Sequence, residues 1–389
     1  MVGRRHWGMG MAGLLGWRNL AHDRSRFVVT LTGIVFAVVL FTMQVGLFLG
    51  FSDSTTSIIR HTGADLWILG KGARNFEITL PIQERELYLA RSVPGVERAE
   101  PLIVQFVPWK KPGGGDESVI VVGFDLNSGL AGPWGLVAGD AAELRRPATV
   151  AIDTLFADKL GVPGASEGRG ETVEINGHRA RIVAMTQGIR SFTTSPWVFT
   201  SLRTAFDLTG FNEDRSNYVI AKVAAGADRI AVRDSLRAIL PRCDVYASEE
   251  FAAMTRDYWM FTTGAGASVL VSAVLGLLVG AVIVAQVLYA TTVDHLAEFG
   301  TLRAMGAPSA FIYKVILGQA VISAVLGHAL GIAVSLLVAK GSEAGAAVIL
   351  VPLPLAGALF GVTLAMCVGA SLVSIRKAMT IDPAMVFQR

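Results

Sequence analysis

The sequence TTVDHLAEFGTLRAMGAP, residues 291–308, contains the charged residues that separate two long segments without any charged side chain. The first charge-free segment, 258–293, ends just before Asp294, and the second, 315–339, follows Lys314. The ionisable residues of the interrupting stretch are Asp294, His295, Glu298 and Arg303. Because charged side chains are costly inside a bilayer, this stretch is expected in water at one membrane face.

The same stretch has the pattern of a short amphipathic helix. Its apolar residues recur at steps of three, which favours one apolar face on a helix. They are Leu296, Phe299, Leu302 and Met305. Gly306 follows the last of them and Pro308 comes two residues later, which is a typical helix stop. We therefore predict a helix held between two membrane spans.

Composition and charge-free runs indicate a membrane protein with four spans. The chain has 389 residues, of which 52% are hydrophobic and 17% are charged, whereas soluble domains carry about 25% charged residues. The charge-free runs are Phe27–Ser52, Tyr258–Val293, Val315–Ala339 and Ala344–Ile375. Each exceeds the roughly 20 residues that a helix needs to cross the hydrocarbon layer. The transmembrane helices are predicted at 27–52, 262–290, 314–339 and 354–375.

The distribution of positive charge predicts the orientation. The leader, 1–26, has five arginines against the single acidic residue Asp23, and the tail, 376–389, begins with Arg376 and Lys377. By the positive-inside rule, both termini belong in the cytoplasm. The leader also has the pattern of a cytoplasmic amphipathic helix. The remaining segments are then an extracytoplasmic domain at 53–257, a cytoplasmic helix at 291–313 and a short extracytoplasmic loop at 340–353. The expected location is the inner membrane of a bacterial cell.

The extracytoplasmic domain is predicted to be α+β. A strand–helix–strand pattern occurs twice, and the two occurrences are far apart in the chain. They cover 64–69, 83–91 and 99–109, then 218–223, 228–240 and 244–247. Two such units indicate a ferredoxin-like split subdomain. The insertion between them is predicted to be β-rich, with strands at 118–124 and 149–152 and an Asn176-Gly177 hairpin within 171–181. Helices at 53–61 and 248–259 are expected to continue the first and second spans outward.

Sequence motifs give no support for a catalytic site in this chain. Gly70-Lys71-Gly72 lacks the spacing of a Walker A motif, and neither GxSxG nor HExxH occurs. Cys243 and Cys367 have no CxxC or histidine neighbour, so no metal site is expected. Among the polar residues of the spans, His328 is interpreted as an interhelical hydrogen-bonding group, with a proton relay as the alternative. Neither a nucleic-acid partner nor a cofactor bound by this chain is expected.

All four spans contain a GxxxG pair. The pairs are Gly46/Gly50, Gly276/Gly280, Gly327/Gly331 and Gly357/Gly361. Glycines at this spacing let helix backbones approach closely. They predict tight helix packing, within one subunit or across a dimer.

The sequence resembles the FtsX/MacB-like class of ABC transporter permeases, and within it the DevC-type permeases. The resemblance covers nearly the whole chain and is strongest toward the C-terminus. Its most specific part is Asp294-His295-Leu296-x-Glu298-x-x-Thr301-Leu302-x-Ala304-Met305-Gly306. Supporting matches are Gln286, Leu288-Tyr289, Tyr258-Trp259, Met366-Cys367, Arg376-Lys377, Asp382-Pro383-Ala384-x-x-Phe387 and, in the outer domain, Val122-Gly123-Phe124.

The resemblance implies a coupling helix, Asp294–Gly306, that docks on a separate cytoplasmic ATPase carrying ATP and Mg²⁺. Within it, Glu298 and Arg303 are expected as polar contacts, and Leu302 and Met305 as apolar contacts beside Ala304. The resemblance also implies a permease homodimer, an outer domain that changes shape with the ATPase cycle, and export of lipid-like cargo. A periplasmic membrane-fusion adaptor and an outer-membrane duct are the further partners it implies.

A receptor or regulator is the alternative class of function. In that case the outer domain senses a ligand or activates cell-wall hydrolases, and nothing is exported. Neighbouring genes for an ATPase and a periplasmic adaptor favour export, whereas one for a histidine kinase or hydrolase favours the alternative.

Overall fold

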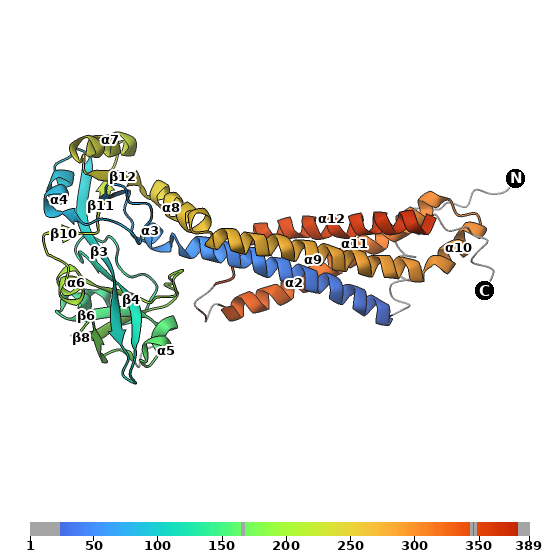
Figure 1. Cartoon of the computed structure of the whole chain (residues 1–389), viewed down its shortest axis with the longest axis horizontal. Helices are drawn as coiled ribbons and strands as arrows, with labels where there is room; N and C mark the ends of the chain where they lie inside the picture. The colour runs from blue at the N-terminus through green and yellow to red at the C-terminus, as the bar shows by residue number, and fades with distance from the viewer. Residues whose placement is uncertain (1–23, 165–167, 343–344, 346–347, 380–389) are drawn as a thin grey trace. The chain divides into compact units, whose positions relative to one another are not determined.

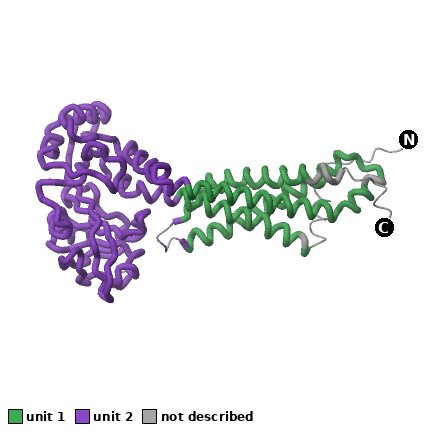
Figure 2. Tube along the Cα trace, viewed as in Figure 1, with its two compact units in different colours: residues 1–49, 268–341, 349–389 green, residues 50–267, 342–348 purple. Residues whose placement is uncertain are grey.

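The computed structural model describes residues 24–379, except 165–167, 343–344 and 346–347, and omits the side chains at 26, 303–304 and 374–379. The predicted leader helix before Arg24 and the closing Asp382–Phe387 motif therefore lie outside the described residues, as do the side chains of Arg376 and Lys377. The chain forms two compact units (Figure 2). Unit 1 comprises 1–49, 268–341 and 349–389, and unit 2 comprises 50–267 and 342–348.

Unit 1 is a bundle of helices. Four helices are long and apolar enough to span a membrane, which confirms the predicted number of spans. They are α2 (Arg24–Ser54), α9 (Ala265–Asp294), α11 (Ser309–Ser342) and α12 (Leu353–Met379), and the shorter α10 (Leu296–Ala304) lies between α9 and α11 in sequence (Figure 1). Buried Ile34, Ala37 and Phe41 of α2 pack with Val284 of α9 and Ala324 of α11 in one core.

Unit 2 contains the predicted ferredoxin-like subdomain. Its elements in chain order are β1 (Leu66–Gly70), α4 (Glu84–Arg91), β3 (Val96–Lys110), β11 (Tyr218–Val223), α7 (Arg229–Ile239) and β12 (Cys243–Ala247). The four strands pair antiparallel in the order β12-β1-β11-β3, with β1 and β11 in the middle. The two strand–helix–strand units thus interleave as a split βαβ fold, and the prediction is confirmed.

The insertion extends the same sheet. β3 is 15 residues long, and its second half pairs with β4 (Asp116–Phe124). Beyond β4 the order continues as β9-β6-β8-β5, with β7 pairing to β3 and β8. These strands are β5 (Leu136–Ala138), β6 (Thr149–Asp153), β7 (Thr172–Ile175), β8 (His178–Thr186) and β9 (Trp197–Ser201). The predicted hairpin is β7–β8, and positive φ at Asn176 (+48°) and Gly177 (+79°) gives its tight turn.

Short elements complete unit 2. They are α3 (Ser57–His61), β2 (Ile82–Gln83), the 3₁₀ helices η1 (Ala141–Arg145) and η2 (Thr154–Phe156), α5 (Ala157–Leu160), α6 (Leu202–Thr209), β10 (Arg215–Ser216), α8 (Ser248–Asp257) and the π-helical turn η4 (Tyr258–Thr262). β2 and β10 pair as a separate two-stranded sheet.

Strand alternation divides the core of the ferredoxin-like sheet between its two faces. Leu66 and Ile68 of β1 pack in a cluster with residues of α4 and α7. Trp67 and Leu69 point the other way, into a cluster that contains Phe251 of α8 and residues of α3. The helices that adjoin α2 and α9 in sequence therefore share one face of the sheet.

Two predicted continuous helices are interrupted. α2 ends at Ser54, and a turn at Thr55 and Thr56 separates it from α3. α8 does not run straight into the second span, because η4 and a bend with Gly264 at φ +77° intervene before α9. The prediction that the helix at 248–259 runs straight into the second span was therefore wrong. A π-helical turn changes the hydrogen-bonding register, and a positive φ cannot continue a right-handed helix.

Candidate functional site

The predicted coupling segment is divided between two helices. α9 ends at Asp294, His295 forms a turn, and α10 begins at Leu296. Backbone hydrogen bonds bridge the turn, since His295 N donates to Thr291 O (3.4 Å) and Phe299 N donates to His295 O (3.1 Å). Both bonds join residues four apart, as in an α-helix, so α10 is tied closely to the end of α9.

α10 packs on the first turns of α11 through a small core of its own. Phe299 is 3% exposed and is the most deeply buried of the α10 side chains that the structure describes. The buried members of this core, here called the α10–α11 core, are Phe299, Ala307, Phe311, Ile312, Val315 and Ile316. Leu302 and Leu317 pack against it while partly exposed. A force on α10 therefore reaches α11 through side-chain contact as well as through the chain.

Gly306 ends α10 as the sequence predicted. Its φ is +88°, a conformation that costs glycine little. Ala307 N donates to Leu302 O (3.0 Å), the bond that defines a Schellman motif. Ala307 belongs to the α10–α11 core, and Leu302 packs against it. The turn between α10 and α11 is thus fixed by hydrogen bonding and by burial together.

The face of α10 that remains accessible differs from the predicted apolar face. Glu298 and Thr301 are exposed, and Met305 is 59% exposed just beyond the helix. Leu302 turns partly into the α10–α11 core, so Leu302 and Met305 do not form one apolar face. Three steps of three residues turn a helix far from its starting face, because one turn takes 3.6 residues. The side chains of Arg303 and Ala304 lie outside the described part.

Polar groups cluster at the junction of α9 and α10. His295 is buried, and its Nδ1 lies 3.2 Å from Glu298 Oε2, one turn later. A groove of about 500 Å³ runs beside Asp294 between the first turns of α2 and the last turns of α9. Its lining residues are Ser25, Val29, Thr30, Gln286, Val287, Ala290, Thr291 and Asp294. Thr30 Oγ1 and Thr291 Oγ1 lie 3.1 Å apart and join the two helices.

Four of the predicted packing glycines have a close neighbour on α2. A Cβ atom on Gly327 would lie 2.4 Å from Ile34 Cγ2, and one on Gly331 would lie 2.6 Å from Val38 Cγ1. A Cβ atom on Gly276 would lie 2.4 Å from Leu40 Cδ2, and one on Gly280 would lie 3.0 Å from Ala37 Cβ. These four contacts all lie against α2, so α2 is the helix on which α9 and α11 converge.

The remaining glycines divide between buried and open positions. Gly46 would place a Cβ 2.6 Å from Ile349 Cγ2, and its carbonyl oxygen accepts a hydrogen bond from Leu350 N (3.0 Å). Gly50 is buried. In contrast, Gly357 and Gly361 are exposed and have nothing within 4 Å of an added Cβ. Substitution of Gly46 therefore disturbs packing within the subunit and is not a clean test of dimerisation.

His328 makes the interhelical contact that its position indicated. Its Nδ1 lies 3.3 Å from Thr363 Oγ1, and its ring meets Phe360 edge-on at 5.2 Å. All three residues are on α11 or α12. The hydrogen-bonding interpretation is confirmed.

Comparison with known families identifies the chain. The family model described as the MacB-like periplasmic core domain matches residues 27–239, more than half of the chain, and the FtsX-like permease C-terminal model matches residues 270–383. The chain belongs to the MacB/FtsX-like ABC transporter permeases. The second match includes α10 with its flanking helices α9 and α11.

Related permeases are similar along almost their entire length. An uncharacterized ABC transporter permease of Mycobacterium tuberculosis is 23% identical over 375 residues, which covers 95% of this chain and 97% of the relative. One from Mycobacterium bovis is 25% identical over 373 residues, with the same two coverages. The periplasmic region of MacB from Actinobacillus actinomycetemcomitans has a TM-score of 0.37 and 10% identity, and the match covers 49% of this chain and 92% of that one.

Unit 2 of this permease also holds a group of residues that sequence patterns did not bring together, here called the stalk clamp. Phe192, from the loop between β8 and β9, lies 5.9 Å from Phe51 at the end of α2 and 4.4 Å from Trp259 in η4, ring centroid to ring centroid. Trp259 Nε1 donates a hydrogen bond to Glu77 Oε2 (2.8 Å). The clamp joins the segments that lead out of α2 and into α9.

Electrostatics distinguishes Glu77 within the stalk clamp. Burial raises the pKa of its carboxyl group to about 7, although the Trp259 hydrogen bond acts in the opposite direction. The Tyr258-Trp259 pair was visible as a motif, but Glu77 and Phe192 had no sequence signal. They lie 182 and 67 residues before Trp259, and only the folded sheet brings them together.

Proposed function

We propose that this chain is the permease subunit that transmits ATP-driven motion from a cytoplasmic ATPase to the extracytoplasmic α+β domain. The family implies the ATPase partner. The observation that supports the proposal is the α10–α11 core, because Phe299 and the Gly306 turn tie α10 to α11 while Glu298 and Met305 stay exposed. An ATPase bound to the exposed face would move α9 and α11 together.

The proposal continues outside the membrane. The end of α2 and the turn before α9 meet in the stalk clamp, so a shift of either helix would reach the loop between β8 and β9. Arg190 of the same loop donates to Gly345 O (3.2 Å) between α11 and α12. One loop thus contacts three segments that connect to the spans.

The product of this motion is proposed to be export. The resemblance to DevC-type permeases supports lipid-like cargo, a second permease copy, a periplasmic membrane-fusion adaptor and an outer-membrane duct. Two open glycines on α12, Gly357 and Gly361, offer a face where a second copy would pack closely. Location in the bacterial inner membrane, with both termini in the cytoplasm, belongs to the same proposal.

A pair of variants tests docking and transmission separately. Glu298→Lys with Met305→Asp changes the exposed face and leaves the α10–α11 core intact, so it should abolish co-purification of the ATPase. Phe299→Ala removes the core side chain and keeps that face, so it should retain the ATPase while permease-stimulated hydrolysis falls severalfold. Both assays use the full permease co-expressed with its ATPase.

A matched control makes the same two kinds of substitution at exposed positions of unit 2. Glu213→Lys with Ile230→Asp alters an exposed carboxylate and an exposed apolar residue (60% exposed) of unit 2 and should leave assembly unchanged. If the α10 double variant co-purifies with the ATPase like wild type and supports normal stimulated hydrolysis, α10 is not the docking helix. In that case a headgroup-bound α10 would explain its exposed face instead.

A further inference from the structure

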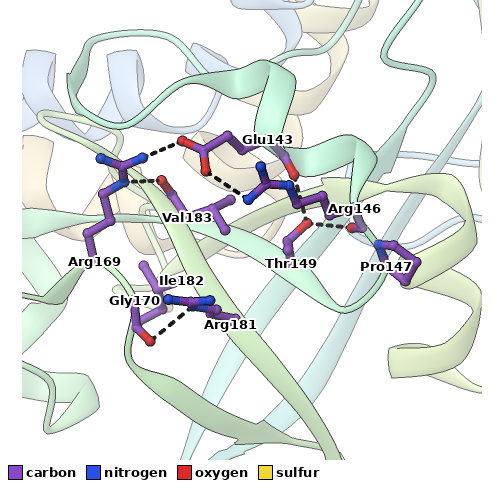
Figure 3. Close-up of a pocket in the computed structure, with 9 residues that line it drawn as sticks. All are labelled: Glu143, Arg146, Pro147, Thr149, Arg169, Gly170, Arg181, Ile182 and Val183. Carbon is purple, nitrogen blue, oxygen red and sulfur yellow. Dashed lines mark hydrogen bonds and ion pairs between the residues drawn. The ribbon is translucent and has the colours of Figure 1, made fainter.

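A second concave site lies in the β-rich insertion of unit 2 and is dominated by arginine. It is a cavity of about 530 Å³ (Figure 3). Its lining residues, here called the arginine pocket, are Glu143, Arg146, Pro147, Thr149, Arg169, Gly170, Arg181, Ile182 and Val183. They come from η1, the start of β6, the segment before β7, and β8. The lining carries three guanidinium groups and one carboxylate, which gives it a net charge of +2.

Glu143 positions two of the three arginines. Arg169 Nη2 donates to Glu143 Oε1, and Arg146 Nη1 lies 3.5 Å from Glu143 Oε2 (Figure 3). The Glu143 side chain is 24% exposed, so its field is screened less than that of a fully solvated carboxylate. Each carboxylate oxygen is thus paired with a different guanidinium, and the carboxylate balances only one of them.

Main-chain groups hold the remaining contacts. Arg169 Nε donates to Val183 O (3.0 Å), and Arg181 Nε donates to Gly170 O (3.2 Å). Buried Thr149 donates from Oγ1 to Arg146 O (2.6 Å), which fixes the backbone at that arginine. A guanidinium has five N–H donors, so these bonds leave most donors of the three arginines unused. Within the described residues, no ion pair involves Arg181.

Two clusters of basic residues elsewhere on unit 2 are electrically balanced. Arg229 and Lys222 share the carboxylates of Asp65 and Glu249. Arg233 and Arg237 likewise share Asp234 and Glu250. Each of these clusters has two cations and two anions and forms a surface network without an excess charge. The arginine pocket differs from these two clusters because it lines a cavity and carries an excess of two positive charges.

We propose that the arginine pocket binds a phosphate monoester. Such a group carries about −1.5 to −2 charge at pH 7, which matches the net charge of the lining. A carboxylate brings only one charge. Guanidinium forks hydrogen-bond phosphate oxygens in pairs, and three of them around one cavity can surround a tetrahedral group. The cavity is large enough for more than the phosphate itself. The ligand is either a soluble phosphate ester or a lipid with a terminal phosphate, and the site does not depend on the proposed coupling role.

Titration of the full permease in detergent micelles tests the chemistry. Glycerol 3-phosphate is the soluble probe, and isothermal titration calorimetry gives its Kd. Wild type should bind, and added NaCl should weaken binding because the site is charged and open. Arg181→Ala should raise Kd about tenfold or more. Arg181→Lys keeps the positive charge but loses the planar guanidinium, so its Kd should lie between those of wild type and Arg181→Ala. Arg85→Ala, an exposed arginine of α4, is the matched control and should bind like wild type.

A second arm identifies the source of the phosphate. Native mass spectrometry of the delipidated permease with added phosphatidic acid, against phosphatidylcholine, reports lipid binding. Retention of phosphatidic acid that Arg181→Ala abolishes indicates a lipid ligand, and binding of glycerol 3-phosphate alone indicates a soluble ester. The proposal is overturned if wild type binds neither probe, or if Arg181→Ala binds both as wild type does while its melting temperature is unchanged.

Discussion

The interior of unit 1 and the interior of unit 2 are packed with different kinds of side chain. The largest fully buried residues of unit 2 are mostly aromatic: Trp67, Trp109, Tyr218, Phe76, Phe156, Phe199 and Phe251. Unit 1 has the aliphatic Ile34, the aromatic Phe41 and Phe311, and several glycines in close contact with neighbouring helices. Burial of large apolar surface drives folding in water, whereas in lipid the helices gain mainly from close approach of their backbones. The two units should therefore respond differently to loss and gain of side-chain volume.

The difference also explains how much of each unit faces outward. In the most apolar 18 residues of each predicted span, only 22% to 39% of the segment is buried inside the protein. Most of the surface of each span therefore remains for lipid or for another subunit. Unit 2, by contrast, buries apolar side chains of its own on both faces of one sheet.

The largest expected effect is in the aromatic core of unit 2. Trp67 is 0% exposed, and its ring lies 5.2 Å from Phe251 and 5.4 Å from Tyr218. Trp67→Ala should destabilise unit 2 by about 3–5 kcal/mol because it leaves a large cavity. For a unit of this size, the melting transition should fall by about 10 °C. Differential scanning calorimetry of the full chain should show the shift in one transition only.

Trp67→Phe is the control for ring loss. It keeps an apolar ring in the cluster and should cost clearly less than Trp67→Ala. A shift of the same size for both variants would contradict the cavity explanation, and a simultaneous shift of the transition of unit 1 would contradict independent cores.

The next effect is a pH dependence that should also belong to unit 2. The pKa of Glu77 is raised to about 7 by burial, while the carboxyl group of an unfolded chain titrates near pH ~4.3. Between these pH values the folded state binds more protons than the unfolded state, so stability falls as pH rises. The contribution is fully present below about pH 4 and is lost above about pH 7, with a magnitude on the order of 3 kcal/mol.

Glu77→Gln tests this dependence because an amide cannot ionise but still accepts the Trp259 hydrogen bond. Between pH 5 and pH 8 the melting temperature of the variant should decline less than that of wild type, and at pH 8 the variant should be the more stable. Glu213→Gln, at an exposed position, should follow the wild-type profile. Parallel profiles for Glu77→Gln and wild type would show that Glu77 titrates normally.

The features that sequence reasoning predicted are those with a local signal. Charge-free runs of span length gave the four helices, alternating strands and the Asn176-Gly177 turn gave the hairpin, and a repeated strand–helix–strand order gave the split subdomain. Interruptions were missed, because the residues of η4 look like an ordinary helix and only Gly264 marks the bend. The predicted apolar face of α10 fails at Met305, which is exposed beyond the helix end, while Phe299 and Leu302 pack toward α11.

Functional candidates built across the fold had no such signal. Glu77 and Trp259 meet only after the whole α+β domain has folded between them. In the arginine pocket, Glu143 and Arg169 are 26 residues apart and come from different elements. A pairwise distance in sequence says nothing about such contacts, whereas the α10 motif was found because all of its residues are consecutive.

A smaller effect tests close packing in unit 1. Gly327→Ala would place a Cβ 2.4 Å from Ile34 Cγ2, a separation that requires the helices to move apart. The free energy of unfolding should fall by about 1–3 kcal/mol, as at other overpacked sites. Gly357→Ala meets nothing within 4 Å and is the matched control, with no loss expected in the monomer. Unfolding in mixed detergent, followed by circular dichroism, compares the two. Equal stabilities would mean that α11 does not approach α2 as closely as the distance indicates.

The smallest effect concerns α10, where unit 1 has a small apolar core of its own. Gly306 has φ +88° and open space around it, so Gly306→Ala should cost about 1 kcal/mol through backbone strain alone. Gly300 lies inside α10, where Gly→Ala should gain a similar amount from helix propensity, up to about 1 kcal/mol. The two substitutions add the same methyl group six residues apart and should change the stability of α10 in opposite directions.

Hydrogen exchange of the α10 amides should be faster in Gly306→Ala and slower in Gly300→Ala, by a factor of roughly five in each case. Exchange that changes in the same direction in both variants would mean that side-chain volume, and not backbone conformation, determines the stability of this helix. If exchange separates them as expected, stimulated ATPase activity of the two assembled complexes then shows whether a stiffer α10 transmits motion better than a frayed one.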